Sequence, residues 1–578
     1  MTASKMLNPV YRPSGWRNPL SEMGTNMKSD NKNRCFGGWP LKRRLLAAGV
    51  MAATVCTPQA VFADEGDWLT RDWEVNGYLR EYLSWNLENP TLIGPDGQQR
   101  DDYRYDLSMA RSVAKLDLYR DFGNWRTKIT GRISRESPTD YGQDLQDVMD
   151  EWAVTGGASG SAVNLRDDVY DAEELREFWV QGNLTETTNI KIGRQQVVWG
   201  ETDFFQLLDV VHGYDFRWRS FLEPENEELR KPLNMINLTQ QIYDLDGTLQ
   251  VLYIPGQLND GEDRGNNYDV EGGRWANNPN KGITFASAPY GSNVRYNYDH
   301  PGADMDDDSF GLRWSGLAGD WGYSLGYFHG PNPNPVANAN PATNSGQPQL
   351  QKGAYKGVYE GRAGEAGEFI FPYIDVFGVT ANNYFAGPDL VFSAELAYIP
   401  NAPYNVGIQS SAEGSGCGFF PGFCGIEEKS LFRSMLRADK QLDLQSMLGT
   451  SRPSFFTVQL FNNWITDFEK DEQIVNLAGF GGETKEFSSI LTAILAANYA
   501  NDQINPSLAL GSDLTYGGGF IIPAVEFAYG NHIRVRVEAD IFFQDKDQDR
   551  PLQGFNDTNL FGYFSGNDQL VARLTYQF

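Results

Sequence analysis

Residues 533–543, IRVRVEADIFF, alternate apolar and charged side chains at almost every position, and residues 569–578, QLVARLTYQF, repeat the alternation. Successive side chains of a β-strand point to opposite faces, so each segment has one apolar face and one face that carries its polar and charged side chains. Charges at this density would be costly in a dry sandwich core, whereas they are ordinary in the wet lumen of a membrane barrel. The pattern predicts an all-β fold, a transmembrane antiparallel β-barrel.

The end of the sequence also indicates how such a barrel is assembled. Leu574, Tyr576 and Phe578 lie on the apolar face of the last predicted strand. This ending resembles the C-terminal signal that the barrel-assembly machinery recognises. We therefore expect this machinery, outer-membrane lipid and lipopolysaccharide as partners, and the outer membrane of a Gram-negative bacterium as the location.

The beginning of the sequence predicts export. Lys42, Arg43 and Arg44 precede an apolar run over 45–55, and small residues end at Ala63, as in a cleaved secretory signal peptide. The run is too short to favour the alternative, an uncleaved anchor. We expect an N-terminal extension plus signal peptide over 1–63, cleavage after Ala63, and a single barrel domain over 64–578.

Turn signals divide the remaining chain into about 18 strands, with 16 as the alternative. Mostly short connections alternate with mostly long ones, which indicates short periplasmic turns and long extracellular loops. A brief connection near 516–517 is the exception and is the reason for the alternative count. The predicted strands are 72–85, 106–120, 124–135, 174–184, 188–196, 233–243, 247–255, 307–317, 320–330, 368–380, 388–400, 429–441, 453–465, 486–499, 505–514, 518–529, 532–544 and 568–578.

The net charge of the chain argues against a nucleic-acid-binding protein, and its cysteines predict a disulfide. The formal charge of the full sequence is -28, and removal of 1–63 makes it about -35, so nucleic-acid binding through a basic surface is not expected. Cys417 and Cys424 remain after cleavage, and in an oxidising compartment we expect them to form a disulfide. We expect no cofactor and no metal site.

Residues 193–211, GRQQVVWGETDFFQLLDVV, resemble the signature of the proteobacterial domain-of-unknown-function 1302 family, DUF1302. The resemblance extends over nearly the whole mature chain and departs from the family pattern at 212–214, where an Asn-Pro-like turn is expected. Family members are outer-membrane barrels, often encoded beside a periplasmic lipid-binding-like protein and an inner-membrane pump of the resistance-nodulation-division type. The resemblance implies both as partners in transport of lipid-like or steroid-like molecules.

The same stretch predicts a constriction inside the barrel. Apolar residues over 203–211 have helical spacing, so we expect a short amphipathic helix just inside the rim. Glu201, Asp203 and Asp209 would pair with Arg194, Arg217 and Arg219. The alternative is that this segment only fixes a loop to the wall. The predicted constriction residues are Arg194, Gln195, Trp199, Glu201, Asp203, Asp209, Arg217 and Arg219.

Strand alternation also predicts a basic stripe on one inner wall, because barrel closure makes the first three strands neighbours of the last two. Such a stripe would favour anionic solutes. The alternative is neutralisation by Asp117, Glu538 and Asp540 across the strands. The predicted stripe is Arg80, Arg111, Lys115, Arg126, Lys128, Arg132, Arg534, Arg536 and Arg573.

Together these features predict a channel or transport protein for small hydrophobic or anionic molecules, and no enzyme. The first alternative is a closed structural or lipid-handling barrel. A remote alternative is an outer-membrane hydrolase, because 322–326 match the GxSxG pattern around Ser324, although within an alternating strand. Acidic groups at 304–308 and at 545–549 are interpreted as solvated loops rather than calcium sites.

Overall fold

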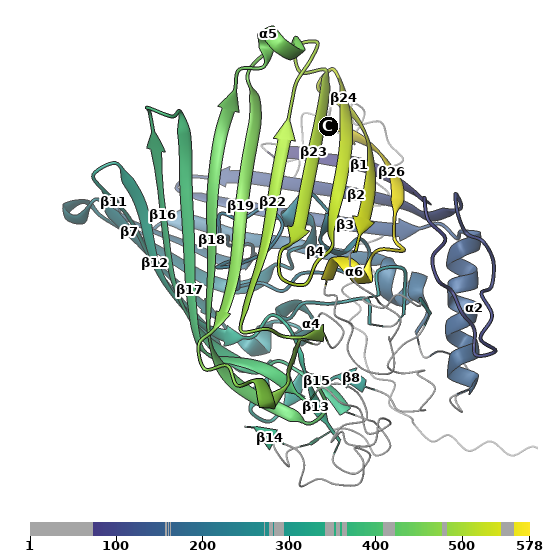
Figure 1. Cartoon of the computed structure of the whole chain (residues 1–578). Helices are drawn as coiled ribbons and strands as arrows, with labels where there is room; N and C mark the ends of the chain where they lie inside the picture. Colours follow the sequence, from purple (N-terminus) through teal and green to yellow (C-terminus); the bar gives the residue numbers. More distant parts are fainter. Residues whose placement is uncertain are drawn as a thin grey trace, which may run out of the picture. The chain divides into compact units, whose positions relative to one another are not determined.

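The computed structural model shows a closed barrel wall built from antiparallel strands (Figure 1). Every described residue belongs to one unit, 53–578. The described residues are 73–155, 159, 161, 163–270, 272–276, 281–282, 294–340, 352–353, 359–360, 367–407, 422–476, 482–544 and 560–578.

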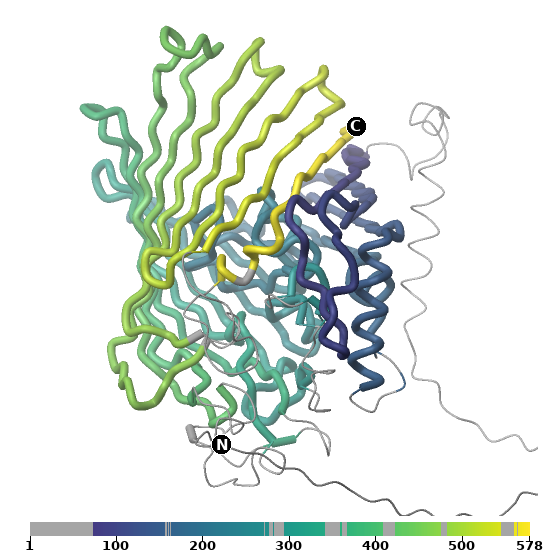
Figure 2. Tube along the Cα trace, turned by 45° about the vertical axis from the view of Figure 1, so that its right-hand side comes forward, coloured from purple at the N-terminus to yellow at the C-terminus, as the bar shows by residue number. Residues whose placement is uncertain are grey.

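The wall has 18 strands, each paired with its neighbours in chain order. It closes where β1 pairs with β26, and Figure 2 shows the purple β1 beside the yellow β26. The count of 18 is confirmed, and the alternative of 16 is wrong. The strands are β1 (Glu74–Asn86), β2 (Leu107–Phe122), β3 (Trp125–Glu136), β4 (Ala172–Asn183), β5 (Thr188–Gln195), β6 (Leu233–Ile242), β7 (Gly247–Ile254), β11 (Ser309–Ala318), β12 (Trp321–Pro331), β16 (Tyr373–Phe385), β17 (Leu390–Val406), β18 (Gly425–Leu442), β19 (Ser454–Ile465), β22 (Phe487–Ala496), β23 (Ile504–Asp513), β24 (Gly519–Tyr529), β25 (Ile533–Phe543) and β26 (Gln569–Gln577).

Connection lengths differ between the two ends of the wall. Short turns join β2 to β3 and β24 to β25, whereas long segments join β5 to β6 and β7 to β11. The brief connection between β23 and β24 lies at the long-loop end, so it does not alter the strand count. The C-terminus lies at the same end of the wall as the short turns and α5 (Gln445–Leu448), as Figure 1 shows.

Side-chain exposure alternates along the wall strands. On β26, Leu570, Leu574 and Tyr576 are exposed, while Val571 and Arg573 are buried. Large apolar side chains such as Phe178, Leu312, Leu396 and Ile521 are likewise exposed on other strands. An outward apolar surface of this kind is suited to lipid. Among the described residues, no helix is long and apolar enough to cross a membrane.

Several small elements lie in the connections between wall strands. The β3–β4 connection contains α2 (Asp140–Thr155) and η1 (Leu165–Tyr170). The other short elements are η2 (Ser220–Leu222), α3 (Asn226–Leu229), η3 (Tyr243–Leu245), η4 (Gly256–Leu258), α4 (Gly261–Arg264), β8 (Val294–Tyr296), β9 (Asp299–His300), β10 (Ala303–Asp304), β13 (Val336–Ala339), β14 (Lys352–Gly353), β15 (Gly367–Ile370), η7 (Lys470–Glu472), β20 (Ile474–Asn476), β21 (Gly482–Glu483) and α6 (Leu560–Tyr563).

Candidate functional site

The long connection between β5 and β6, residues 196–232, folds into the barrel, and we call it the inner segment. It contains η2 and α3, and its side chains contact inward-facing residues from both sides of the wall. The amphipathic helix predicted over 203–211 is not formed; this part of the chain is irregular. Its apolar residues are satisfied by packing on the wall, so no helix is needed to bury them.

One side of the inner segment packs on an apolar part of the inner wall. Fully burying a large apolar side chain stabilises a fold by about 1.5–3 kcal/mol, so this packing is a strong attachment. The segment contributes Val197, Trp199, Leu207, Leu208, Val210 and Val211, and the wall contributes Met235, Leu252, Phe328, Val376, Ala397, Met435 and Phe461, among others.

Glycines on the wall make room for this packing. A β-carbon on Gly378 of β16 would lie 2.5 Å from Leu208, and one on Gly311 of β11 would lie 2.9 Å from the ring of Trp199. The Trp199 indole N–H donates a hydrogen bond to Gln250 of β7 at 3.0 Å. These hollows hold the segment in one position on the wall.

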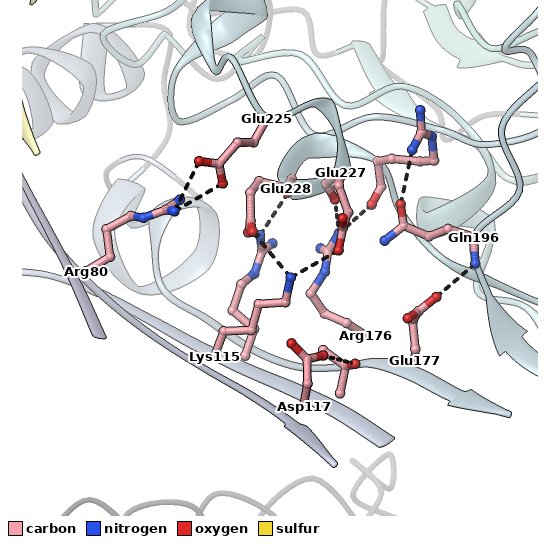
Figure 3. Close-up of polar contacts among 12 residues, drawn as sticks. Arg80, Lys115, Asp117, Arg176, Glu177, Gln196, Glu225, Glu227 and Glu228 are labelled. Atoms are coloured by element: carbon pink, nitrogen blue, oxygen red, sulfur yellow. Dashed lines mark hydrogen bonds and ion pairs between the residues drawn. The ribbon is translucent and has the colours of Figure 1, made fainter. Parts of the chain in front are cut away.

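The opposite side of the inner segment carries acids that meet the basic stripe (Figure 3). Two of these contacts hold α3 and the residue before it. The Arg80 guanidinium of β1 lies 3.1 Å from the Glu225 carboxylate. The Lys115 ammonium of β2 lies 3.1 Å from the Glu227 carboxylate.

Two further ion pairs are buried on both sides. Arg132 of β3 lies 3.0 Å from Glu228, and Arg573 of β26 lies 3.1 Å from Glu223, with every side chain at most 9% exposed. Removing one partner of such a pair leaves an uncompensated buried charge, so these contacts hold the segment strongly in place.

The rest of the stripe has other partners. Arg111 pairs with Glu136 at 3.4 Å, Lys128 with Glu177 at 2.5 Å, and Arg536 with Glu538 at 2.6 Å. Arg126 is half-exposed beside Glu74, and Arg534 donates to the backbone carbonyls of Gly530 and Ile533. Of the predicted neutralising acids, Asp117 lies 3.7 Å from Lys128, and Asp540 lies 3.6 Å from Arg219. The acids of the inner segment, which we did not predict as partners, neutralise the centre of the stripe.

The predicted ion pairs of the constriction are wrong. Arg194 pairs with Asp263 at 2.9 Å, and Arg217 pairs with Asp215 at 2.8 Å. Arg219 pairs with Glu223, Glu538 and Asp540.

The three acids predicted as their partners also make other contacts. Asp203 reaches Arg437 of β18, Asp209 pairs with Arg230, and Glu201 accepts from Asn382 of β16. Gln195 is buried and donates to the Met235 carbonyl. Contacts across the barrel determine these ion-pair and hydrogen-bond partners, so the spacing of the residues along the sequence does not predict them.

His212 is a structural residue of the site that we did not predict. Its Nε2 accepts the Val197 backbone N–H at 2.9 Å, and its Nδ1 lies 2.9 Å from the Lys231 carbonyl. The ring is buried, and its contacts with Val197 and Lys231 join the two ends of the inner segment. Burial, reinforced by the charge of Arg230, lowers the pKa of His212 to about 3, so the ring is neutral. The departure from the family pattern at 212–214 was the only signal for it.

Comparison with known proteins identifies the family. The family described as "Protein of unknown function (DUF1302)" matches residues 41–578. The chain belongs to the DUF1302 family. No curated protein matches this DUF1302 chain.

Solved structures of outer-membrane proteins are similar to this DUF1302 chain at low identity. Salmonella typhi OmpF in complex with daunomycin is 10% identical, covering 88% of this chain and 97% of that chain, with a TM-score of 0.36. Pseudomonas aeruginosa OccK9 (OpdG) is 9% identical, covering 88% and 98%, with a TM-score of 0.41. The Acinetobacter baumannii outer membrane channel DcaP is 10% identical, covering 88% and 97%, with a TM-score of 0.34. At these scores the similarities carry no argument about function.

The remaining candidate sites of this DUF1302 protein are structural or lie outside the described residues. Ser324 lies in the middle of β12 and bonds to the Thr380 hydroxyl at 2.8 Å, so it lacks the strand-to-helix turn of a hydrolase nucleophile. Asp308 accepts from the Tyr253 hydroxyl and the Gly256 backbone N–H. In the part of the chain that is described, no group of three or more His, Cys, Asp or Glu residues could hold a metal ion.

Other predictions fall partly or wholly on residues that are not described. Cys424 is disulfide-bonded, but Cys417 lies outside the described residues, so the pairing of the two stays a prediction. The signal peptide, the cleavage after Ala63 and the acidic group at 545–549 also lie outside them.

Proposed function

We propose that this protein is a transport channel of the Gram-negative outer membrane for small hydrophobic or anionic molecules, and that the inner segment controls passage through it. The observation that carries the proposal is the position of this segment, which attaches to opposite sides of the inner wall by different forces. Ion pairs to Arg132 and Arg573 hold one side, and apolar packing around Trp199 holds the other.

Such a segment narrows the lumen and can be released by loss of its contacts. Its carboxylates form ion pairs with the basic side chains at the centre of the stripe. Without the segment, these basic side chains would face solvent. Displacing the segment therefore exposes Arg80, Lys115, Arg132 and Arg573 together, and this change favours the entry of anions. Control of the pore and preference for anions are two consequences of one movement.

The proposal includes partners that the family resemblance implies. We propose that a periplasmic lipid-binding-like protein delivers or receives the transported molecule, and that an inner-membrane pump of the resistance-nodulation-division type supplies the energy. This part rests on association within the family. It is tested by photo-cross-linking from the short-turn end of the barrel, for example from 444 in the β18–β19 turn, with position 387 as a second site.

Planar-bilayer recording tests the channel itself. The purified protein is compared with a variant in which 200–228 is replaced by a short Gly-Ser linker. We expect small or infrequent conductance from the wild type and a larger, steady, anion-preferring conductance from the variant. A variant that assembles, as shown by heat-modifiable migration, but conducts no better than the wild type would contradict control by the inner segment.

The filled interior favours a second candidate function, a closed lipid-handling barrel. Besides the apolar cluster around Trp199, a second cluster joins Tyr82 and Trp218 to α2, and a third joins Phe221 to Phe520 and Phe561. A barrel filled to this extent could serve as the outer end of an envelope transport system without an aqueous pore. Cross-linking to a periplasmic protein, with no conductance from the wild type or from the linker variant, would favour this function.

A further inference from the structure

A cavity of about 340 Å³ lies inside the barrel beside the inner segment. Phe205 and Phe221 of the inner segment form part of its lining. Residues of other connections and of the wall complete it, among them Ile399 and Tyr404 of β17 and Arg433 of β18. Its volume is within the range of small-molecule sites, roughly 300–1,000 Å³.

Arg433 brings a positive charge to this lining of apolar and polar side chains, without an acidic partner among the described residues. Its guanidinium donates to the Gln206 carbonyl of the inner segment. Among the described residues no carboxylate lies within 4.0 Å of it, whereas Arg437, four residues further along β18 on the same face, pairs with Asp203 and Asp439. A guanidinium has five N–H donors, so several remain for a ligand.

The other charged groups that line the cavity are already engaged. Asp209 pairs with Arg230, and Asp513 accepts the backbone N–H groups of Thr515 and Tyr516. The Lys485 ammonium donates to the Thr515 carbonyl. Arg433 is therefore the group best placed to attract an anion into the cavity.

The lining also provides a surface for a hydrophobic body. The rings of Phe205 and Phe221 lie 5.8 Å apart, and Phe205 also contacts Phe461 of β19 at 5.5 Å. Leu431 of β18 and Ile399 of β17 are buried at the same cavity. Aromatic rings bury a large apolar area and prefer other aromatic rings in stacked or edge contacts.

We infer that this cavity binds a hydrophobic carboxylate, with the carboxylate held by Arg433 and the apolar body against Phe205 and Phe221. The planar guanidinium matches a carboxylate through two parallel hydrogen bonds. The inference rests on the proposed function and deepens it, because it names the class of molecule that would bind inside the channel during transport. The site contacts the inner segment at Phe205, Gln206 and Phe221, so its occupant and that segment are in direct contact.

Calorimetry on the full-length protein in lipid nanodiscs tests the inference, with 2-naphthoate as the probe and 2-naphthylmethanol as its neutral counterpart. We expect Arg433→Gln to weaken naphthoate binding about tenfold or more and to leave the alcohol unchanged. Arg433→Lys should retain part of the difference between the two probes. Arg452→Gln removes the same charge from an exposed arginine in the β18–β19 turn, outside the stripe and the cavity, and should bind naphthoate as the wild type does.

The inference is overturned if the wild type shows no saturable binding of naphthoate, or if Arg433→Gln binds it as tightly as the wild type. Equal weakening of both probes would also overturn it, because that result would indicate a damaged cavity rather than a lost anion contact. Bilayer conductance of the same preparations separates the two proposals. Conductance without binding contradicts this site alone, and binding without any conductance contradicts transport alone.

Discussion

The ring of Phe578 occupies the space beside Gly77 where a β-carbon would stand: an atom built there would lie 2.8 Å from the ring. The two residues also exchange backbone hydrogen bonds, each of 3.0 Å, at the edge where β1 meets β26. Both face outward in the strand alternation. The aromatic end of the chain therefore closes the barrel against a position that has no side chain.

Gly77→Val should impair closure of the barrel. The added side chain would meet the Phe578 ring and the Lys115 carbonyl, and overpacking of this kind costs about 1–3 kcal/mol. We expect a lower yield of the heat-modifiable folded form in membranes. Leu79→Val, on the same outward face of β1, is the matched control and should fold normally. Equal folded yields from the two variants would refute the role of the Gly77–Phe578 contact.

Gly378→Val should loosen the inner segment without disrupting the wall. Its side chain would enter the space of Leu208, which is buried, and push the segment away from β16. We expect more frequent openings in bilayers and faster tryptic cleavage within 196–232. Gly387→Val, in the β16–β17 turn where nothing lies within 4 Å of an added β-carbon, should behave as the wild type. Unchanged openings in Gly378→Val would show that the glycine hollow does not hold the segment.

The wall of this barrel could be predicted from the sequence because the signal is local. Alternation along 533–543 places Arg534 and Arg536 on the inner face of the wall, independently of the conformation of the rest of the chain. Each predicted strand overlaps a wall strand. Closure of the wall then brings Arg80 and Arg573 together without further information: Tyr82, two residues along β1 from Arg80, pairs with Arg573.

The inner segment could not be predicted in the same way, because its conformation depends on partners far along the chain. The spacing of Phe204, Leu207 and Val211 suits a helix, but contacts with the wall override this weak local preference. Asp209 lies closer in sequence to Arg217 than to Arg230, and it pairs with Arg230. Only the folded chain shows which acid reaches which base.

Glu228→Gln should destabilise the inner segment more than Glu227→Gln does. Glu228 is buried between Arg132 and Lys115, and removal of its charge leaves these bases without full compensation, at a cost of about 3–5 kcal/mol. Glu227 is 57% exposed and among the described residues pairs with Lys115 alone, so its loss should cost about 0–1 kcal/mol. Tryptic cleavage rates within 196–232 compare the two variants directly. Similar rates would mean that the buried pair does not hold the segment.

Acid should release the inner segment through His212. The pKa of the buried ring is lowered to about 3, whereas in a displaced segment it returns towards its ordinary value of 6.5. The bound segment holds a neutral ring and the displaced one takes up a proton below pH 6.5. The stability that His212 provides is therefore complete above pH 6.5 and decreases as the pH falls towards 3, by about 1.4 kcal/mol for each pH unit.

We therefore expect the open probability of the wild-type channel to rise between pH 7 and pH 5, where the segment loses about 2 kcal/mol of attachment. Burial opposes ionisation of Glu228, but its neighbouring bases, Arg132 first, outweigh this and lower its pKa below the usual range, so Glu228 stays charged in this window. His212→Gln removes the titrating ring and should abolish the rise, while His532→Gln at the short-turn end should keep it. If His212→Gln responds to acid as strongly as the wild type, the pH dependence arises from another group and His212 acts only as a fixed tie between Val197 and Lys231.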